Sequence, residues 1–436
     1  MRSLNTLPPV EQRISALDAG EEVVSHRGSP LLVLGGPGTG KTRLVEQRYL
    51  HLAANSGVDP HRILLLCSSR SYSVQAKERL VRALPRRATV DLHVYTWHAL
   101  AYHLVSRYYP VLQYSEPPVL LTAPEQWGAV RELLAEEDPA AWPQWGNRLK
   151  ERAFVDEVAD FCLRVEQGLH SAESLAALAS TKPEWAEVIA FVDVYRSRLK
   201  ARSRMDYAQL IASAVRLLGE DAAVAGALRE RFPYVIVDDG QDMGPVHLAL
   251  LSHLETANLV VAADPDSGIE TYRGAQPDWV WGFEKEFGPH RSVILPENHR
   301  VGAPLAGALE QLIRINDESA PHRAAPADHR TDFECRQYQS TVEEVTAIAR
   351  ELRRQHVLEG VAWSDMAVLV SQPRYLLAPL QRALEQCEVP YRPLQGDRPL
   401  SSEPVVRLFL DLVRVAVGSG PARLLPELLT SPLGGR

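Results

Sequence analysis

The feature that most constrains the fold is an eight-residue segment directly after a short apolar run. Residues 35–42 read Gly-Gly-Pro-Gly-Thr-Gly-Lys-Thr and follow the run Leu-Leu-Val-Leu at 31–34. This order matches the phosphate-binding loop G-x-x-x-x-G-K-[ST], which lies between a buried strand and a helix. Its glycines let backbone N–H groups converge on phosphate oxygens in conformations that a Cβ would block. The preceding apolar run favours this interpretation over an ordinary glycine-rich turn with a solvated lysine.

The same loop predicts how a nucleoside triphosphate is held. Lys41 supplies a positive charge to the β- and γ-phosphates, and the Thr42 hydroxyl can bind Mg²⁺. The helix that begins here adds the partial positive charge of its N-terminus. The predicted nucleotide-binding residues are Gly35, Gly36, Pro37, Gly38, Thr39, Gly40, Lys41 and Thr42.

The length and the cysteine usage of the chain limit its architecture. A chain of 436 residues is too long for one compact core, so roughly two to four domains are expected. The four cysteines are far apart and form no C-x-x-C pair. Zinc sites, iron–sulfur clusters and a disulfide framework are therefore not expected.

Composition and charge limit where the protein works and what it binds. Apolar residues make up 45% and charged residues 23%, which is typical of globular proteins. No apolar run has membrane-spanning length and no signal-peptide layout opens the chain, so we predict a cytoplasmic protein that does not enter a membrane. Because the net charge is −8, any nucleic-acid site has to be a local basic groove.

Apolar runs of strand length alternate with helical patterns in two parts of the chain. Short continuous runs of this kind predict a parallel sheet that is covered on both faces. Residues 106–205 show no clear strand pattern, and Phe154, Val155, Val158, Phe161 and Cys162 share one helix face. We expect this stretch to be a helical insertion between two halves of one nucleotide-binding domain. The candidate strands are 31–34, 63–66, 234–237, 259–262 and 293–295.

A second alternating block begins near residue 330. Its pattern predicts a helix over 342–354, a strand over 366–370 and a helix over 375–388. The preceding stretch 319–328 is rich in Pro and Ala and is expected to be a surface loop. Residues 404–417 have helical spacing and are expected to open a further helical unit.

An acidic segment follows one of the predicted strands. Residues 234–237 lead into Asp238-Asp239-Gly240-Gln241-Asp242. Mg²⁺ is held by an acidic residue at the carboxyl end of a parallel strand beside a phosphate loop, which makes Asp238 the metal-binding candidate. Asp239 is then the candidate base that polarises the attacking water. The alternative is a helix N-cap cluster, because Asp favours that position too.

An ordered set of segments resembles the UvrD/Rep-type superfamily 1 DNA helicases, with the AdnA-type helicase–nuclease subunits of actinobacteria as the most similar subgroup. The order of the whole set is more specific than any one segment. Residues 35–42, 64–80 and 95–100 resemble motifs I, Ia and Ib; 205–211 resemble the segment before motif II; 238–242, 263–275 and 295–300 resemble motifs II, III and IV.

The resemblance implies a DNA motor with ATP and Mg²⁺ as cofactors and single-stranded DNA as the partner. It implies 3′-to-5′ movement and a role in DNA repair or recombination. Gln241 would couple the nucleotide to the DNA site, and Arg300 would reach the γ-phosphate from the second domain. Ordinary core packing remains the alternative for Trp97 and Tyr272, as a surface ion pair does for Arg300. The implied DNA-binding residues are Thr96, Trp97, His98, Tyr272 and Arg273.

The resemblance also implies an α/β fold of RecA-like phosphate-loop domains with parallel sheets and helical insertion domains. Residues 1–105 and 206–290 would form the first RecA-like, ATP-binding domain, and 106–205 its helical insertion. Residues 291–395 would begin the second RecA-like domain, and 396–436 would begin a second, truncated insertion.

Several positions depart from the family pattern. Asp239 stands where the family has Glu and is one methylene shorter, and a misplacement near 1 Å can cost on the order of 100-fold in rate. Ser267 replaces a Gln and Glu270 an aromatic residue in motif III, and Ser68 replaces the stacking aromatic of motif Ia. The adenine-reading Gln is expected near 20 and 21, which are Gly and Glu here. These departures predict a weakened motor.

The chain has no counterpart of motifs V and VI before residue 436, which predicts either a fragment or a subunit that a partner completes. Two functions follow. The first is an ATP-dependent DNA helicase or translocase. The second is a non-motor subunit that binds ATP and DNA inside a heterodimeric helicase–nuclease. An unrelated phosphate-loop ATPase or kinase does not explain the ordered motifs.

Overall fold

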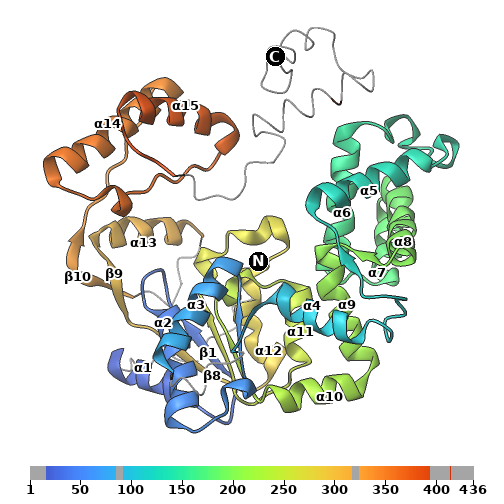
Figure 1. The fold of residues 1–436 in the computed structure, drawn as a ribbon, viewed down its shortest axis with the longest axis horizontal. Helices are drawn as coiled ribbons and strands as arrows, with labels where there is room; N and C mark the ends of the chain where they lie inside the picture. Colours follow the sequence, from blue (N-terminus) through green and yellow to red (C-terminus); the bar gives the residue numbers. More distant parts are fainter. Residues whose placement is uncertain (1–15, 85–91, 317–323, 393–412, 414–436) are drawn as a thin grey trace, which may run out of the picture. The chain divides into compact units, whose positions relative to one another are not determined.

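The computed structural model describes residues 16–84, 92–316, 324–392 and 413, and Figure 1 shows its ribbon. The chain divides into two compact units, Met1–Phe333 and Glu334–Arg436. The predicted helical segment 404–417 and the predicted insertion 396–436 lie outside the described residues, apart from position 413.

A six-stranded parallel sheet forms the centre of the first unit. Its order is β3-β2-β6-β7-β1-β8, and all five pairings are parallel. All five predicted strands are present within a residue or two. The strand that the sequence did not predict is β3, at the edge of the sheet, where polar and apolar residues alternate. The strands are β1 (Leu31–Leu34), β2 (Ile63–Cys67), β3 (His93–Thr96), β6 (Tyr234–Val237), β7 (Leu259–Ala263) and β8 (Arg291–Ile294).

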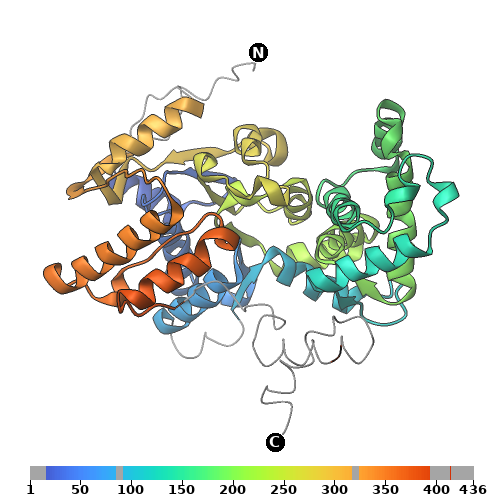
Figure 2. The same cartoon turned by 90° about the horizontal axis from the view of Figure 1, so that it is seen from above.

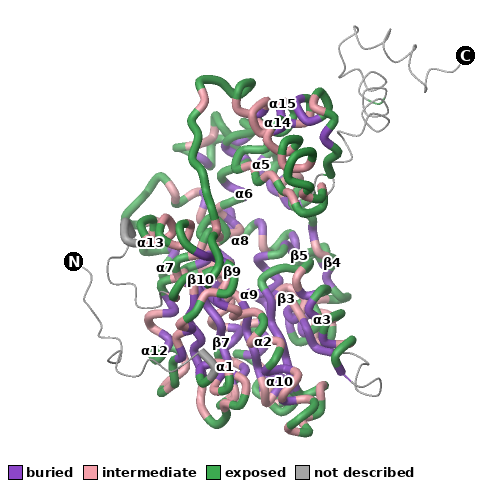
Figure 3. The backbone as a smooth tube through the Cα atoms, turned by 90° about the vertical axis from the view of Figure 1, so that its left-hand side faces the viewer, coloured by how far each residue is buried: buried purple, intermediate pink, exposed green. Residues whose placement is uncertain are grey.

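Helices cover both faces of this sheet because successive strand residues point to opposite sides. Leu31 and Val33 pack with α1 (Ala16–Ser25), α2 (Lys41–Leu50) and α3 (Arg70–Ala83). Leu32 and Leu34 pack into the core on the other face. That core includes α4 (Trp97–Tyr108), α9 (Tyr207–Glu220), α10 (Ala222–Arg231) and α11 (Pro245–Ser252). The strands are therefore among the most buried segments (Figure 3), which confirms the predicted α/β class with a doubly covered parallel sheet.

The segment between β3 and β6 includes a helical bundle with its own core (Figure 2). Phe154, Val155, Val158 and Cys162 are buried on one face of α6 (Arg152–Gln167), as their spacing predicted. Two short strands, β4 (Val119–Leu120) and β5 (Arg204–Met205), form a two-residue parallel ladder between the chain before the bundle and the chain after it. The sequence did not indicate this ladder. The bundle helices are α5 (Ala123–Glu136), α6 (Arg152–Gln167), α7 (Ala172–Thr181) and α8 (Ala186–Ala201).

The first unit continues past the sheet. β8 pairs with β1, so residues 291–294 lie in the first sheet rather than at the start of a second one. After α12 (Phe283–Phe287) and β8, the strand β9 (Glu297–Pro304) pairs with β10 (Ala325–Thr331), and α13 (Leu305–Asn316) lies between them in the chain. Part of the predicted loop 319–328 is therefore strand.

The second unit contains two packed helices within its described residues. α14 (Thr341–Glu359) and α15 (Pro373–Gln386) agree with the predicted helices and bury Val345, Leu380 and Leu384 between them. The predicted strand at 366–370 is not formed, since none of the strands in the described residues pairs with this segment. Among the residues that the structure describes, no helix has the length and apolarity needed to cross a bilayer.

Candidate nucleotide site and adjoining surface

The phosphate loop connects the end of β1 to the start of α2. Gly38 and Gly40 have φ angles of 85° and 89°, in the left-handed region that favours glycine. A Cβ on Gly38 would clash with Asn298 Oδ1, so a side chain there would also displace Asn298. The two glycines therefore let the loop adopt this backbone conformation. Without side chains, they also let its backbone lie close to Asn298 and keep its N–H groups available to a ligand.

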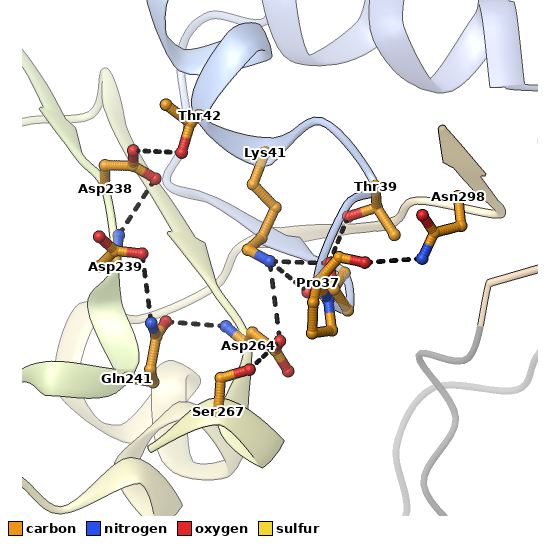
Figure 4. Close-up of polar contacts among 12 residues, drawn as sticks. Pro37, Thr39, Lys41, Thr42, Asp238, Asp239, Gln241, Asp264, Ser267 and Asn298 are labelled. Atoms are coloured by element: carbon orange, nitrogen blue, oxygen red, sulfur yellow. Dashed lines mark hydrogen bonds and ion pairs between the residues drawn. The ribbon is translucent and has the colours of Figure 1, made fainter. Parts of the chain in front are cut away.

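Lys41, the first residue of α2, reaches back along the loop (Figure 4). Its Nζ donates to the carbonyl oxygens of Gly35 at 2.6 Å and Gly36 at 3.0 Å. The Asp264 carboxylate at the end of β7 lies 3.8 Å from the same nitrogen. Burial lowers the pKa of the Lys41 ammonium, and the nearby carboxylates of Asp264 and Asp238 act in the opposite direction. The cation is thus held inside the loop where phosphate oxygens would bind.

Thr42 and Asp238 form the pair that fits a magnesium ion. The Thr42 hydroxyl donates to Asp238 Oδ2 at 2.8 Å, and the Asp239 N–H donates to Asp238 Oδ1 at 3.1 Å. Burial, followed by the adjacent Asp239, raises the pKa of Asp238 to about 6. A bound cation would favour the ionised carboxylate. Hard oxygen donors of this kind suit Mg²⁺, which binds few protein groups and keeps substrate phosphates and waters as its other ligands.

Asp239 lies at the centre of a chain of hydrogen bonds. Its carboxylate accepts from Ser68 Oγ at 3.0 Å and from Gln241 Nε2 at 3.3 Å. Gln241 in turn accepts from the Asp264 N–H at 2.9 Å, and Ser267 Oγ donates to Asp264 Oδ2. The segment that resembles motif Ia therefore contacts the Asp239 carboxylate directly, and Gln241 connects that carboxylate to the segment that resembles motif III. Ser68 and Ser267, which replace other residues of the family pattern, are both part of this chain.

Asn298 of β9 lies against the phosphate loop, a contact that the sequence did not predict. Its Nδ2 donates to the Pro37 carbonyl at 2.6 Å, and its Oδ1 accepts from the N–H groups of Arg300 at 2.9 Å and Val301 at 2.8 Å. The His299 N–H donates to the Gly38 carbonyl at 2.9 Å. Asn298 thus links the loop to the backbone of Arg300, whose charge acts on Lys41. The sequence offered one signal for this residue, since Asn298 lies two positions before Arg300 in the segment that resembles motif IV.

The residues expected to bind DNA occupy different environments. Thr96 caps α4, with Oγ1 accepting from the Ala99 N–H at 3.2 Å. Trp97 is only 6% exposed and packs edge-on against His247 in the core. The ring of His98 contacts Tyr207, and burial lowers its pKa, with Arg273 adding to the effect. The structure therefore places Trp97 with the core, as the packing alternative states, and leaves it little surface for DNA.

Tyr272 and Arg273 lie on an exposed 3₁₀ turn, Glu270–Arg273. The Tyr272 side chain is 60% exposed, and the Arg273 guanidinium lies 5.2 Å from its ring centroid. Arg273 also forms an ion pair with Glu270 at 3.2 Å. Burial, followed by the carboxylates of Asp239 and Glu270, raises the pKa of the neighbouring Asp242 to about 6. Tyr272 is thus free to stack, but its basic neighbour is partly neutralised.

Comparison with known proteins agrees with this arrangement. A family model described as the UvrD/REP helicase N-terminal domain matches residues 18–288. The ATP-dependent DNA helicase PcrA of Leuconostoc citreum is 24% identical over 385 residues, 86% of this chain and 49% of that protein. PcrA of Staphylococcus aureus strain Mu50 is 22% identical over 422 residues, covering 95% of this chain and 55% of the relative.

The ATP-dependent DNA helicase UvrD1 of Mycobacterium bovis is 24% identical over 448 residues, 98% of this chain and 56% of that protein. The chain therefore spans about half the length of these curated relatives.

Proposed function

Because the chain belongs to the UvrD/Rep helicase family, we propose that it is the ATP-binding part of an ATP-dependent DNA helicase or translocase of DNA repair or recombination. One observation supports the proposal most strongly. The phosphate loop and the acidic end of β6 meet, with Thr42 Oγ1 2.8 Å from Asp238 Oδ2. The matched relatives carry the name ATP-dependent DNA helicase.

The geometry supports a division of roles in ATP hydrolysis. Lys41 exchanges its loop carbonyls for phosphate oxygens when the nucleotide enters. A magnesium ion beside Thr42 and Asp238 would neutralise charge on the β- and γ-phosphates. Asp239 orients the attacking water and accepts its proton. Arg300 stabilises the charge that develops on the γ-phosphate.

DNA would bind beside Asp239, on the side of Ser68 and the 3₁₀ turn that carries Tyr272. Tyr272 stacks on a base, a contact worth roughly 1–3 kcal/mol that does not depend on sequence. Thr96, His98 and Arg273 supply polar contacts, while Trp97 fixes the start of α4 from the core. Gln241 links Asp239 to Asp264, so a shift of the DNA-binding segments can reach the catalytic base.

The motor is proposed to be slow. Asp239 has a shorter reach than the Glu of the family and is held by both Ser68 and Gln241. Glu270 places a negative charge beside Tyr272, where DNA phosphates would pass, and pairs with Arg273. Both features reduce the gain in hydrolysis that DNA can produce.

The same observations favour a second candidate, a non-motor subunit of a heterodimeric helicase–nuclease that binds ATP and DNA. The similarity to AdnA-type subunits, the 3′-to-5′ polarity and the cytoplasmic location remain predictions. The domain boundaries 1–105 with 206–290, 106–205, 291–395 and 396–436 remain predictions too, although residues 291–294 belong to the first sheet.

DNA-stimulated hydrolysis distinguishes the two candidates. We expect single-stranded DNA to raise the ATPase rate of a protein that contains these residues by about tenfold. Lys41→Ala should abolish the activity. Lys285→Ala should leave it intact, because Lys285 lies exposed on α12. An ATPase rate that DNA leaves unchanged would contradict the motor and favour the non-motor subunit.

A further inference from the structure

A large cavity lies at the amino ends of the strands, opposite the phosphate loop. Its volume is about 1020 Å³, at the upper limit of small-molecule sites. His61, His93 and Phe232 line it, and they lie at or just before the first residues of β2, β3 and β6. The nucleotide site lies at the carboxyl ends of the same sheet. The length of the strands, roughly 15 Å, therefore separates the two sites.

A series of rings forms one wall of this cavity. The ring centroids of His61 and His93 are 5.8 Å apart, those of His93 and Tyr95 5.6 Å, and those of Tyr95 and His103 4.9 Å. Phe232 packs edge-on against His93 at 5.1 Å. These spacings are typical of aromatic pairs, and the exposed rings at the two ends, His61 and His103, leave room for a planar group to stack.

Arginines surround the rings. Arg62, Arg107 and Arg231 line the cavity and are exposed, and Glu230 is the one carboxylate in the lining. Among the described residues, none of these three guanidinium groups has an ion-pair partner. A local excess of positive charge on a chain with a net charge of −8 marks an anion site. Exposed guanidinium groups bind phosphate with paired N–H donors.

A buried hydroxyl in the lining supports a ligand. Ser106 Oγ has no hydrogen-bond partner within the described part of the chain. Buried polar atoms without a partner are uncommon in folded proteins, because the lost hydration has to be replaced. Ser106 lies on α4, one residue before Arg107 and three after His103. Because Oγ itself is closed off from solvent, a group bound in the cavity would satisfy it only after the Ser106 side chain rotates toward the arginines.

We propose that this cavity is a second nucleotide-binding site, separate from the phosphate loop. The base stacks on the wall of His and Tyr rings, and the phosphate binds Arg107 and Arg231. The ligand is a free nucleotide or one unit of a single strand, which share this chemistry. The rings favour a nucleotide over a simple anion, since an inorganic anion gains nothing from them. The inference does not depend on ATP hydrolysis.

Binding of thymidine 5′-monophosphate tests the proposal, measured by calorimetry in a Lys41→Ala background so that the phosphate loop contributes little. We expect the double substitution Arg107→Glu and Arg231→Glu to weaken binding by at least about tenfold. Tyr95→Ala should also weaken it, whereas Tyr95→Phe should not. Arg152→Glu is the matched control, because Arg152 is 87% exposed on the helical bundle.

The outcomes are distinct. Tighter binding of a thymidine tetranucleotide, lost in the double variant, identifies a strand as the ligand, and equal binding identifies a free nucleotide. Equal affinities of the native and double-variant cavities would overturn the proposal, as would inorganic phosphate binding as tightly as the nucleotide. Circular dichroism melting of each variant checks that the substitutions, including those of the partly buried Tyr95, leave the fold intact.

Discussion

The Thr42 hydroxyl donates a 2.8 Å hydrogen bond to Asp238, although 196 positions separate the two residues in the chain. Thr42 follows β1 and Asp238 follows β6, and only β7 lies between these strands in the sheet. Parallel pairing brings the carboxyl ends of all three strands to one edge. The pair therefore depends on the strand order.

Removing the Thr42 hydroxyl without changing its shape should weaken Mg²⁺ binding. Thr42→Val is nearly isosteric and loses both the bond to Asp238 and the oxygen offered to the metal. We expect ATPase activity to fall on the order of 100-fold and to need more Mg²⁺ for half-maximal rate. Thr42→Ser keeps the hydroxyl and should retain most activity. Equal Mg²⁺ dependence in the two variants would contradict the assigned role.

Asp239→Glu should accelerate hydrolysis if the shorter side chain slows the motor. The added methylene restores the reach of the family residue, so kcat should rise several-fold. Asp239→Asn removes the base and should lower kcat on the order of 100-fold or more. Steady-state ATPase measurements with single-stranded DNA check both changes. A Glu variant that is slower than the native protein would remove the basis for the weakened motor.

Asn298→Ala should disturb the phosphate loop from outside it. The variant loses the bond to the Pro37 carbonyl and the cap on the N–H groups of Arg300 and Val301. We expect a loss of about 1 kcal/mol in stability and a lower kcat/KM for ATP. Asn298→Asp keeps the acceptor but not the donor, so it should preserve the cap and lose only the loop contact. Identical kinetics of both variants and the native protein would show that the contact is dispensable.

Asp206 should make stability depend on pH. It is 1% exposed, and it accepts bonds from the Tyr195 hydroxyl at 2.7 Å and the Gln209 N–H at 2.8 Å. Burial raises its pKa from 3.8 to about 6. Since the folded protein then holds the proton more tightly than the unfolded chain, this group's contribution to the free energy of unfolding falls as pH rises from about 4 to 6.

Asp206→Asn removes that titration. The stability advantage of the native protein over the variant should therefore shrink between pH 4.5 and pH 7, by an amount on the order of 2 kcal/mol. Urea unfolding at the two pH values measures the difference. Parallel pH profiles of the two proteins would show that Asp206 titrates alike in the folded and unfolded states.

Local sequence patterns predicted the helices and strands whose formation depends mainly on contiguous residues. The apolar runs at 31–34 and 234–237 coincide with β1 and β6, since a fully buried strand has to be apolar along its whole length. The edge strand β3 was missed because its pattern mixes His and Thr with apolar residues. The run 366–370 was predicted as a strand and is not one. A strand needs a neighbouring strand to pair with, and no strand in the described residues pairs with this run.

The candidate site divides in the same way. The loop 35–42 and the acidic segment after β6 could be identified by spacing, because backbone geometry and phosphate chemistry require those residue types in that order. Nothing local indicates that Ser68 and Gln241 hold Asp239, or that Asn298 touches Pro37. The local pattern also does not show that Trp97 is buried while Tyr272 is exposed.

By itself, the sequence determined that a phosphate loop follows a buried strand and that this strand belongs to a parallel sheet covered on both faces. Both features depend on contiguous residues, so a local pattern is enough to recognise them. The tertiary structure alone decided which distant side chains share one carboxylate, which ring faces solvent, and that histidines and arginines from four elements line a single cavity. Such contacts depend on strand order and helix packing, which bring together residues that are far apart in the chain.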